Sequence, residues 1–253
     1  GKKEMVVKHT DYVQLENNKK IHGETCNGPG ALSVKIYFPL TDYVEGEQQD
    51  VDSKDSIKIT VMDSLLTAAR EGNLNEIKRL GSLRDVDVSK PHRGVTAICM
   101  AASHGHLDIV KYLVEEKGVD PNQTEDEGTS LVHAAANNGR LKIVKYLVEE
   151  ANVQDPNKPD TYGKTPLMYA AENGHLNVVK YLVETAGAKI LNEDKDGESP
   201  LIFASEEGHL DVVQYLVSKG ADPNKQDTRG YAPINFADAN GHHDVVEYLR
   251  SIN

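Results

Sequence analysis

Large apolar side chains and cysteines are scarce in this sequence of 253 residues. It contains no Trp, three Phe and two Cys, and 38% of its residues are hydrophobic. The two thiols, Cys26 and Cys99, are too few for a disulfide framework or a four-ligand zinc site, so we expect both to be reduced. The low apolar content argues against one central core and favours small units that each bury a thin layer against their neighbours.

Basic residues are also in deficit, with 28 Lys and Arg against 40 Asp and Glu, which gives a net charge of −12. A surface of this charge repels phosphate backbones, so we expect no nucleic-acid partner and favour protein partners with basic patches. No run approaches the ~18 apolar residues of a membrane span, and no secretory signal segment opens the chain. We therefore expect a monomeric cytoplasmic protein without a membrane span, and leave a nuclear location open.

One pattern recurs along the chain. Residues 105–114 read Gly-His-Leu-Asp-Ile-Val-Lys-Tyr-Leu-Val, and related segments begin at Gly139, Gly174, Gly208 and Gly241, with a weaker forerunner at Gly72. The spacings between these glycines are 33, 34, 35, 34 and 33 residues. A period of this length indicates stacked supersecondary units. In each unit the apolar spacing predicts a second helix after the glycine, preceded by a shorter first helix with small residues on one face.

The first helices start with Thr or Ser followed by Pro in two units, Thr165-Pro166 and Ser199-Pro200, as expected for an N-cap and a first helical turn. The segments Gly-Lys-Thr-Pro-Leu at 163–167, Gly-His-Leu-Asn-Val-Val-Lys-Tyr-Leu at 174–182 and Gly-Ala-Asp-Pro-Asn at 220–224 closely resemble the ankyrin repeat family. The resemblance covers about residues 62–253. It implies a mostly α fold, namely an ankyrin-repeat solenoid with a cap repeat and five repeats of 33–35 residues, each a helix–turn–helix followed by a β-hairpin-like finger. The family's His after Thr-Pro-Leu is present only as His133, so its hydrogen bonding is expected to be absent or replaced in most repeats.

Residues 1–61 do not share the repeat. Short alternating runs, including 32–36 and 57–61, are separated by turn signals and predict a small β-rich N-terminal segment. Because about 60 residues are marginal for an independent β fold, we expect this segment to pack on the first repeat of the 62–253 domain. Two alternatives stay open: the segment is separately mobile, or it occupies the binding face of the repeats and blocks it.

Three patterns imitate chemical sites but fail in detail. The repeated histidines lie about one repeat, roughly ~10 Å, apart, too far to share a zinc ion, so we interpret them as orienting the turn into the second helix: His106, His175, His209 and His242. Residues 192–197 resemble the start of an EF-hand loop, but Phe203 occupies the position of the bidentate Glu. Residues 163–165 resemble the end of a P-loop, but Lys158 replaces its first Gly. We therefore predict no metal, no cofactor and no catalytic residues.

A tyrosine recurs in every second helix, and we call this set the tyrosine ladder: Tyr112, Tyr146, Tyr181, Tyr215 and Tyr248. A stripe at repeat spacing is usually core or half-buried filler, with the hydroxyl groups in solvent. We interpret the ladder in this way and not as a binding surface.

The resemblance implies that partners dock on a concave face made by finger tips and first helices. Seven of the fifteen positions that match this face in the second to fourth repeats are acidic, and two are Lys. Two Tyr, Tyr162 in these positions and Tyr231 in the last repeat, lie on the same face, and aromatic residues ringed by polar groups are common interface anchors. The predicted partner-binding residues, which we call the acidic face, are Asp126, Glu127, Tyr162, Glu172, Asp196, Glu198, Glu206, Glu207, Arg229 and Tyr231.

The sequence thus predicts a non-catalytic adaptor or scaffold that binds a basic or mixed-charge segment of another protein. Tyr162 and Tyr231 would anchor the segment, while the carboxylates steer it and set its register. The alternative from another class is a targeting part of a larger enzyme or effector, with residues 1–61 as a docking element.

Overall fold

The computed structural model describes residues 61–84, 86–92 and 94–252. The β-rich segment predicted for 1–61 lies outside these residues except for Val61, which begins a helical segment over 61–71. The strand predicted for 57–61 was therefore wrong at Val61. Cys26 also lies outside the described residues, whereas Cys99 is a free, buried thiol. The chain from Ser64 onward forms one compact unit.

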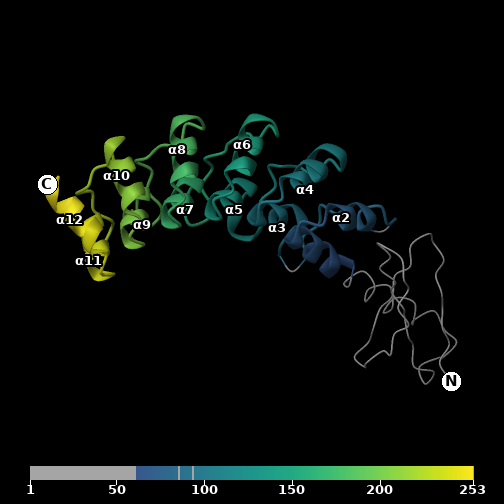
Figure 1. The fold of residues 1–253 in the computed structure, drawn as a ribbon, viewed down its shortest axis with the longest axis horizontal. Coiled ribbons are helices and arrows are strands. Elements are labelled where there is room, and N and C mark those ends of the chain that lie inside the picture. Colours follow the sequence, from purple (N-terminus) through teal and green to yellow (C-terminus); the bar gives the residue numbers. More distant parts are fainter. Residues whose placement is uncertain (1–60, 85, 93, 253) are drawn as a thin grey trace, which may run out of the picture. The chain divides into compact units, whose positions relative to one another are not determined.

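Pairs of short helices follow one another along this unit. They are α2 (Leu74–Leu80), α3 (Ala97–His104) with α4 (Leu107–Lys111), α5 (Leu131–Asn137) with α6 (Leu141–Glu149), α7 (Pro166–Glu172) with α8 (Leu176–Glu184), α9 (Pro200–Glu206) with α10 (Leu210–Ser218), and α11 (Pro233–Ala239) with α12 (His243–Ser251). A π-helical turn, η2 (Tyr112–Glu116), continues α4, and a 3-10 turn, η3 (Asp126–Gly128), precedes α5. The first helices α3, α5, α7, α9 and α11 contact one another in order, and the second helices form a parallel row (Figure 1).

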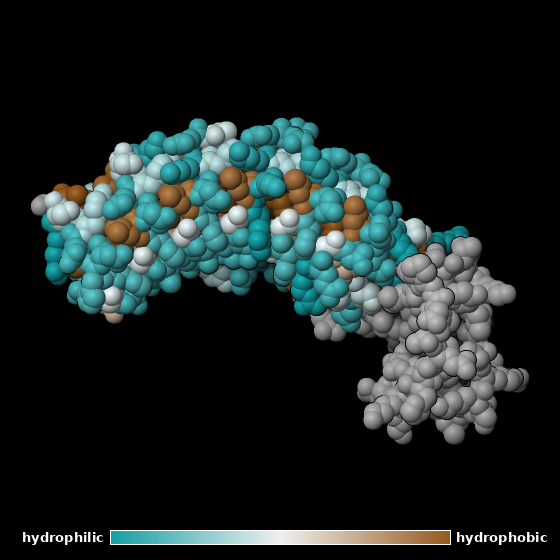
Figure 2. All heavy atoms as spheres, viewed as in Figure 1, coloured by the Kyte–Doolittle hydropathy of each residue, from teal (hydrophilic) through white to brown (hydrophobic). Residues whose placement is uncertain are grey.

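The connections between the pairs contain turns and only two isolated β-bridges within the described residues, His92 with Val95 and Thr124 with Ser130. The finger predicted for each repeat is therefore a chain of tight turns in this region of the protein, without a sheet. Apolar patches recur along the repeats on one face of the unit (Figure 2). This distribution fits a stack in which every unit buries its own thin apolar layer.

The core of each unit combines small residues of the first helix with branched residues of the second. The first helices contribute alanine pairs with no exposed surface, and the second helices contribute residues such as Ile143, Leu147, Val178 and Leu182, each at most 1% exposed. The N-caps predicted for the first helices are present, since Thr165 Oγ1 accepts from the Met168 N–H, and Pro occupies the first turn of α7.

The histidines that follow the interhelical glycines connect neighbouring repeats. His209 Nε2 donates to the Glu172 carbonyl at 3.0 Å, and His175 Nε2 donates to the Asn137 carbonyl at 3.1 Å. In the repeat that lacks this His, Arg140 Nε donates to the equivalent carbonyl at 2.9 Å. A side chain from each of these repeats therefore binds the end of the preceding first helix. The sequence predicted a structural role in the turn into the second helix, but not this bond between repeats.

These rings pack on the interhelical glycine of the preceding repeat. Gly174 has a φ of +68°, and a Cβ added to it would lie 2.5 Å from Nδ1 of His209. The left-handed backbone and the ring both exclude a side chain at this position. The recurring glycine is thus explained by a contact between repeats as well as by the turn itself.

His133 binds two repeats together from the interior. Its Nδ1 accepts from the Ser130 N–H at 3.1 Å, and its Nε2 donates to the Lys164 carbonyl at 3.1 Å. In the last repeat Asn235 Oδ1 takes over the first of these bonds and accepts from the Ala232 N–H at 2.8 Å. The expectation that other groups replace this hydrogen bonding holds at that repeat.

The tyrosine ladder is bonded more specifically than the sequence predicted. Tyr146, Tyr181 and Tyr215 donate their hydroxyl groups to Glu115, Glu149 and Glu184 of the preceding second helix, at 3.1, 2.8 and 3.1 Å. A Lys of the preceding second helix also lies over each of these three rings, at 4.7–5.6 Å from the ring centre. The expectation that these hydroxyl groups only reach solvent was wrong, because the repeat period brings a Glu within reach of each of them.

Candidate functional site

The acidic face is built by the ends of the first helices and the turns that precede them. Glu172 and Glu206 are the last residues of α7 and α9, and Glu207 is the C-cap of α9. Asp126 and Glu127 lie in η3. The other predicted residues lie in the turns before α7, α9 and α11: Tyr162, Asp196, Glu198, Arg229 and Tyr231.

An aspartate three residues before the opening glycine organises three of these turns. Asp160 Oδ1 accepts from the N–H groups of Tyr162 and Lys164, at 2.8 and 2.9 Å. Asp194 and Asp227 accept from the equivalent N–H groups of their own turns. The sequence reasoning missed these aspartates, although their fixed position before glycine could have revealed them. They hold the backbone from which the face residues project.

The turn of the second full repeat is built differently. Glu125 occupies the aspartate position, and its carboxylate instead reaches the preceding repeat, where it accepts from the N–H and Oγ1 of Thr96 at 2.6 and 2.8 Å. Glu127 adopts a left-handed φ of 65°. Its carbonyl accepts from the Thr161 N–H at 2.8 Å, so the tip remains bonded to the next turn.

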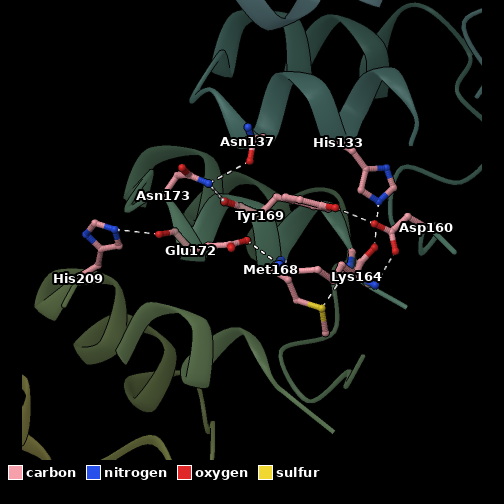
Figure 3. A network of polar contacts seen from close by, with 10 residues as sticks. His133, Asn137, Asp160, Lys164, Met168, Tyr169, Glu172, Asn173 and His209 are labelled. Carbon is pink, nitrogen blue, oxygen red and sulfur yellow. Dashed lines mark hydrogen bonds and ion pairs between the residues drawn. The ribbon is translucent and has the colours of Figure 1, made fainter. Parts of the chain in front are cut away.

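A lysine of the protein is already paired with one carboxylate of the acidic face, Glu172 (Figure 3). Lys164 Nζ lies 2.8 Å from Glu172 Oε2, and it lies over the rings of Phe203 and Tyr169 at 4.1 and 5.0 Å. The Lys164 side chain is only 18% exposed. Tyr169 in turn donates to Asp160 at 2.7 Å, which fixes the ring under the ammonium group. The charge of Glu172 is therefore balanced within the protein.

An arginine has the same role further along the stack, in the turn before α11. The Arg229 guanidinium binds Asp227 Oδ2 through Nε at 2.7 Å and Glu198 Oε1 through Nη2 at 2.6 Å. It also lies over the rings of Tyr231 and Phe236, at 5.8 and 5.6 Å. Burial would raise the pKa of Asp227, but the Tyr231 N–H and the Arg229 contacts hold that pKa below its ordinary value. Arg229 thus belongs to the face as its internal cation.

Glu206 differs from Glu172 and Glu198 because no hydrogen bond or ion pair reaches its carboxylate within the described residues. It is half-buried at the end of α9. Burial first, and then the charges of Glu207 and Glu172, raise the pKa of Glu206, although Lys164 and Arg229 act in the opposite direction. Glu206 and its exposed neighbour Glu207 are therefore adjacent carboxylates of the face that have no ion-pair partner among the described residues.

The two predicted aromatic anchors are both half exposed, Tyr162 at 51% and Tyr231 at 52%. The Tyr162 hydroxyl donates to Glu127 Oε1 of the preceding repeat at 2.7 Å. The Tyr231 ring packs edge-on against Phe236, with 6.3 Å between ring centres. Both rings are thus held in place while much of each remains open to a partner.

These observations define a stacked helical-repeat protein with a polar face built on its first helices and turns. The family model described as ankyrin repeats (3 copies) matches residues 47–125, 65–160, 116–194, 152–227 and 186–253. The chain belongs to the ankyrin repeat family. The match begins at residue 47, upstream of the resemblance expected from residue 62. No curated protein matches the sequence.

Ankyrin repeats are generally protein–protein interaction modules, and the family is typically non-catalytic. Among the described residues, no helix is both long and apolar enough to cross a membrane. The described residues also contain no cluster of three or more His, Cys, Asp or Glu arranged to hold a metal ion.

Proposed function

We propose that this module binds a basic or mixed-charge segment of another protein on the acidic face, as a non-catalytic adaptor or scaffold. One observation carries the proposal. Glu172 and Glu198 each have an internal cation, whereas Glu206 and Glu207 of the same face form no ion pair among the described residues. A Lys or Arg from a partner would supply the missing charge at the centre of the face.

The raised pKa of Glu206 gives this binding a physical driving force. Burial first, and then repulsion by Glu207 and Glu172, disfavours the charged form of Glu206. A cation placed against Glu206 lowers this repulsion and favours the ionised carboxylate. Binding should therefore release protons at mildly acidic pH and weaken as the pH falls, because protonation of Glu206 removes the attraction.

The remaining residues of the face have narrower roles in the proposal. Tyr162 and Tyr231 offer rigid rings against which apolar portions of the segment pack. Asp126 and Asp196 add to the negative field that steers a basic segment. Arg229 provides a local positive charge beside Glu198, so a segment of mixed charge finds complementary groups along the same face.

Charge reversal at the centre of the face tests the proposal. Binding of the full chain is measured on an array of short peptides of basic, acidic and neutral composition, followed by titration of the basic peptides that bind. We expect Glu206→Lys with Glu207→Lys to abolish the binding of basic peptides. We expect wild-type binding to fall steeply between low and physiological salt, because the Debye length shrinks to ~8 Å at physiological ionic strength.

A matched variant separates local from overall charge. Glu150→Lys with Glu247→Lys changes the net charge by the same amount, but these exposed residues lie at the end of α6 and on α12, away from the first helices. This control should retain most of the binding. If the two double variants bind basic peptides equally well, the acidic face is not the binding site.

A further inference from the structure

The turn that follows α8 departs from the other turns at the same place in the repeat. Three of these turns read Asp-Pro-Asn, at residues 120–122, 155–157 and 222–224, whereas residues 189–191 read Lys-Ile-Leu. The backbone is nevertheless the same. The Asn192 N–H donates to the Lys189 carbonyl at 3.3 Å, as the Lys225 N–H does to the Asp222 carbonyl at 3.3 Å. The turn therefore does not depend on Lys-Ile-Leu for its shape.

The replaced residues have bonds in the other turns that Lys189 and Leu191 cannot make. Asp155 Oδ1 accepts from the Asn157 N–H at 2.9 Å and stabilises the turn. Asn157 Nδ2 donates to the Ala186 carbonyl of the next repeat at 2.7 Å. A leucine side chain cannot form this bond between repeats. The substitution thus gives up polar contacts that stabilise the other turns.

An apolar depression lies where these contacts are lost. Leu191 is 65% exposed and is the most exposed large hydrophobic side chain among the described residues. We call the following set the Leu191 patch, since its residues line one shallow, open depression: Val183, Ala188, Lys189, Ile190, Leu191, Asn192 and Lys219. A single exposed leucine is common on protein surfaces. Leu191, however, lies in a depression and is one of three consecutive residues that differ from the Asp-Pro-Asn of the other turns.

The rim of the Leu191 patch is basic although the whole chain is acidic. Lys189 is exposed, and its ammonium group makes no hydrogen bond or ion pair within the described residues. Lys219 Nζ lies 2.9 Å from Glu184 Oε1, and this pair is largely open to solvent. The nearby Glu193 is paired with Lys225 at 3.0 Å. A second copy of the chain would bring the same lysines to the rim, so the charge favours a partner that supplies a carboxylate.

We propose that the Leu191 patch binds a short segment of another protein that combines apolar side chains with a neighbouring carboxylate. The apolar side chains pack against Ile190 and Leu191, and the carboxylate pairs with Lys189. The Leu191 patch contains none of the acidic-face residues. It favours a negatively charged segment, whereas the acidic face favours a positively charged one. One adaptor would then contact two segments of different chemistry through two surfaces.

Restoring the regular turn is the test that leaves the fold intact. Lys189→Asp, Ile190→Pro and Leu191→Asn together recreate the sequence of the other three turns. The Ile190 N–H makes no backbone hydrogen bond within the described residues, so proline fits there. We expect the resistance of this triple variant to urea to equal or exceed that of the wild type.

The probes are four blocked fluorescent peptides in a Gly-Ser frame, with the cores Glu-Leu-Leu-Glu, Gln-Leu-Leu-Gln, Lys-Leu-Leu-Lys and Glu-Ser-Ser-Glu. Fluorescence polarisation with the full chain measures their affinities, and NMR shift changes locate their binding. We expect Glu-Leu-Leu-Glu to bind best and to shift residues 189–192, and the triple variant to bind it about tenfold more weakly. Lys189→Gln alone should remove the preference for Glu-Leu-Leu-Glu over Gln-Leu-Leu-Gln.

Three results would overturn the proposal: no binding of Glu-Leu-Leu-Glu, Lys-Leu-Leu-Lys shifting residues 189–192 with equal affinity, or unchanged binding of Glu-Leu-Leu-Glu by the triple variant. The acidic face is tested separately in the same experiment. Glu206→Lys with Glu207→Lys should leave the binding of Glu-Leu-Leu-Glu at residues 189–192 unchanged. Failure at one surface therefore does not count for or against the other.

Discussion

Replacement of Gly174 by alanine should reveal how strongly the repeats are joined by the histidine contacts. The left-handed φ of +68° at Gly174 costs about 1–2 kcal/mol for a residue with a Cβ. The added Cβ would also lie 2.5 Å from Nδ1 of His209, which must move. Movement of the ring breaks the 3.0 Å bond to the Glu172 carbonyl, worth about 1 kcal/mol. We expect Gly174→Ala to lower the free energy of unfolding by about 2–3 kcal/mol.

A second glycine in the same repeat isolates the contribution of the ring. Gly187 has a φ of +72°, but nothing lies within 4 Å of a Cβ added to it. Gly187→Ala should therefore show only the backbone cost, and the difference between the two variants measures the contact with His209. Urea unfolding followed by circular dichroism gives both values.

In a His209→Ala background this difference should disappear, because the ring is no longer there to be displaced. Hydrogen exchange across the α8–α10 region shows whether the loss is local to the junction between repeats. Equal destabilisation by Gly174→Ala and Gly187→Ala in the wild-type background would refute the reasoning that the ring explains the glycine.

Three further predictions rest on other contacts described above. Tyr181→Phe should lower the free energy of unfolding by about 1 kcal/mol, because the hydrogen bond to the preceding repeat is lost. The Tyr248 hydroxyl has no such bond among the described residues, so Tyr248→Phe should change the free energy of unfolding little; urea titration measures both. Burial lowers the pKa of His133, so the unfolded chain binds more protons than the folded one, and the free energy of unfolding should fall as the pH drops below about 6.5. His133→Gln should flatten this pH dependence, which urea titrations at several pH values measure. Lys164→Met removes the cation from Glu172, so a basic peptide should bind about threefold to tenfold more tightly in titrations at low salt. Weaker binding would contradict the proposal that basic peptides bind the acidic face.

Much of the fold could be predicted because each unit repeats the same local signals. Glycines such as Gly174 mark the turn between helices, and Thr165 with Pro166 marks the start of a first helix. The spacing of apolar residues predicts the second helix without knowledge of its neighbours. The prediction failed at Val61, which lies in a helix, because a short apolar run does not distinguish a strand from a helix.

The candidate site was predictable only as a set of positions. The repeat period indicates that Glu198 and Arg229 lie on neighbouring turns, but not that their side chains meet at 2.6 Å. The aspartates behind the turns were overlooked, although Asp160 accepts from two backbone N–H groups. The role of a surface residue depends on which neighbouring side chain reaches it, and that is a property of the stack.

The sequence by itself determined that this protein is a stack of helical pairs, because the signals for these helices are local and recur along the repeats. Only the tertiary structure decided which carboxylates of the acidic face are already neutralised. Lys164 and Arg229 satisfy Glu172 and Glu198, and Glu206 is left without a cation among the described residues. The physical reason is that ion pairing depends on distances of a few ångströms between side chains from different repeats, and no pattern along one repeat contains those distances.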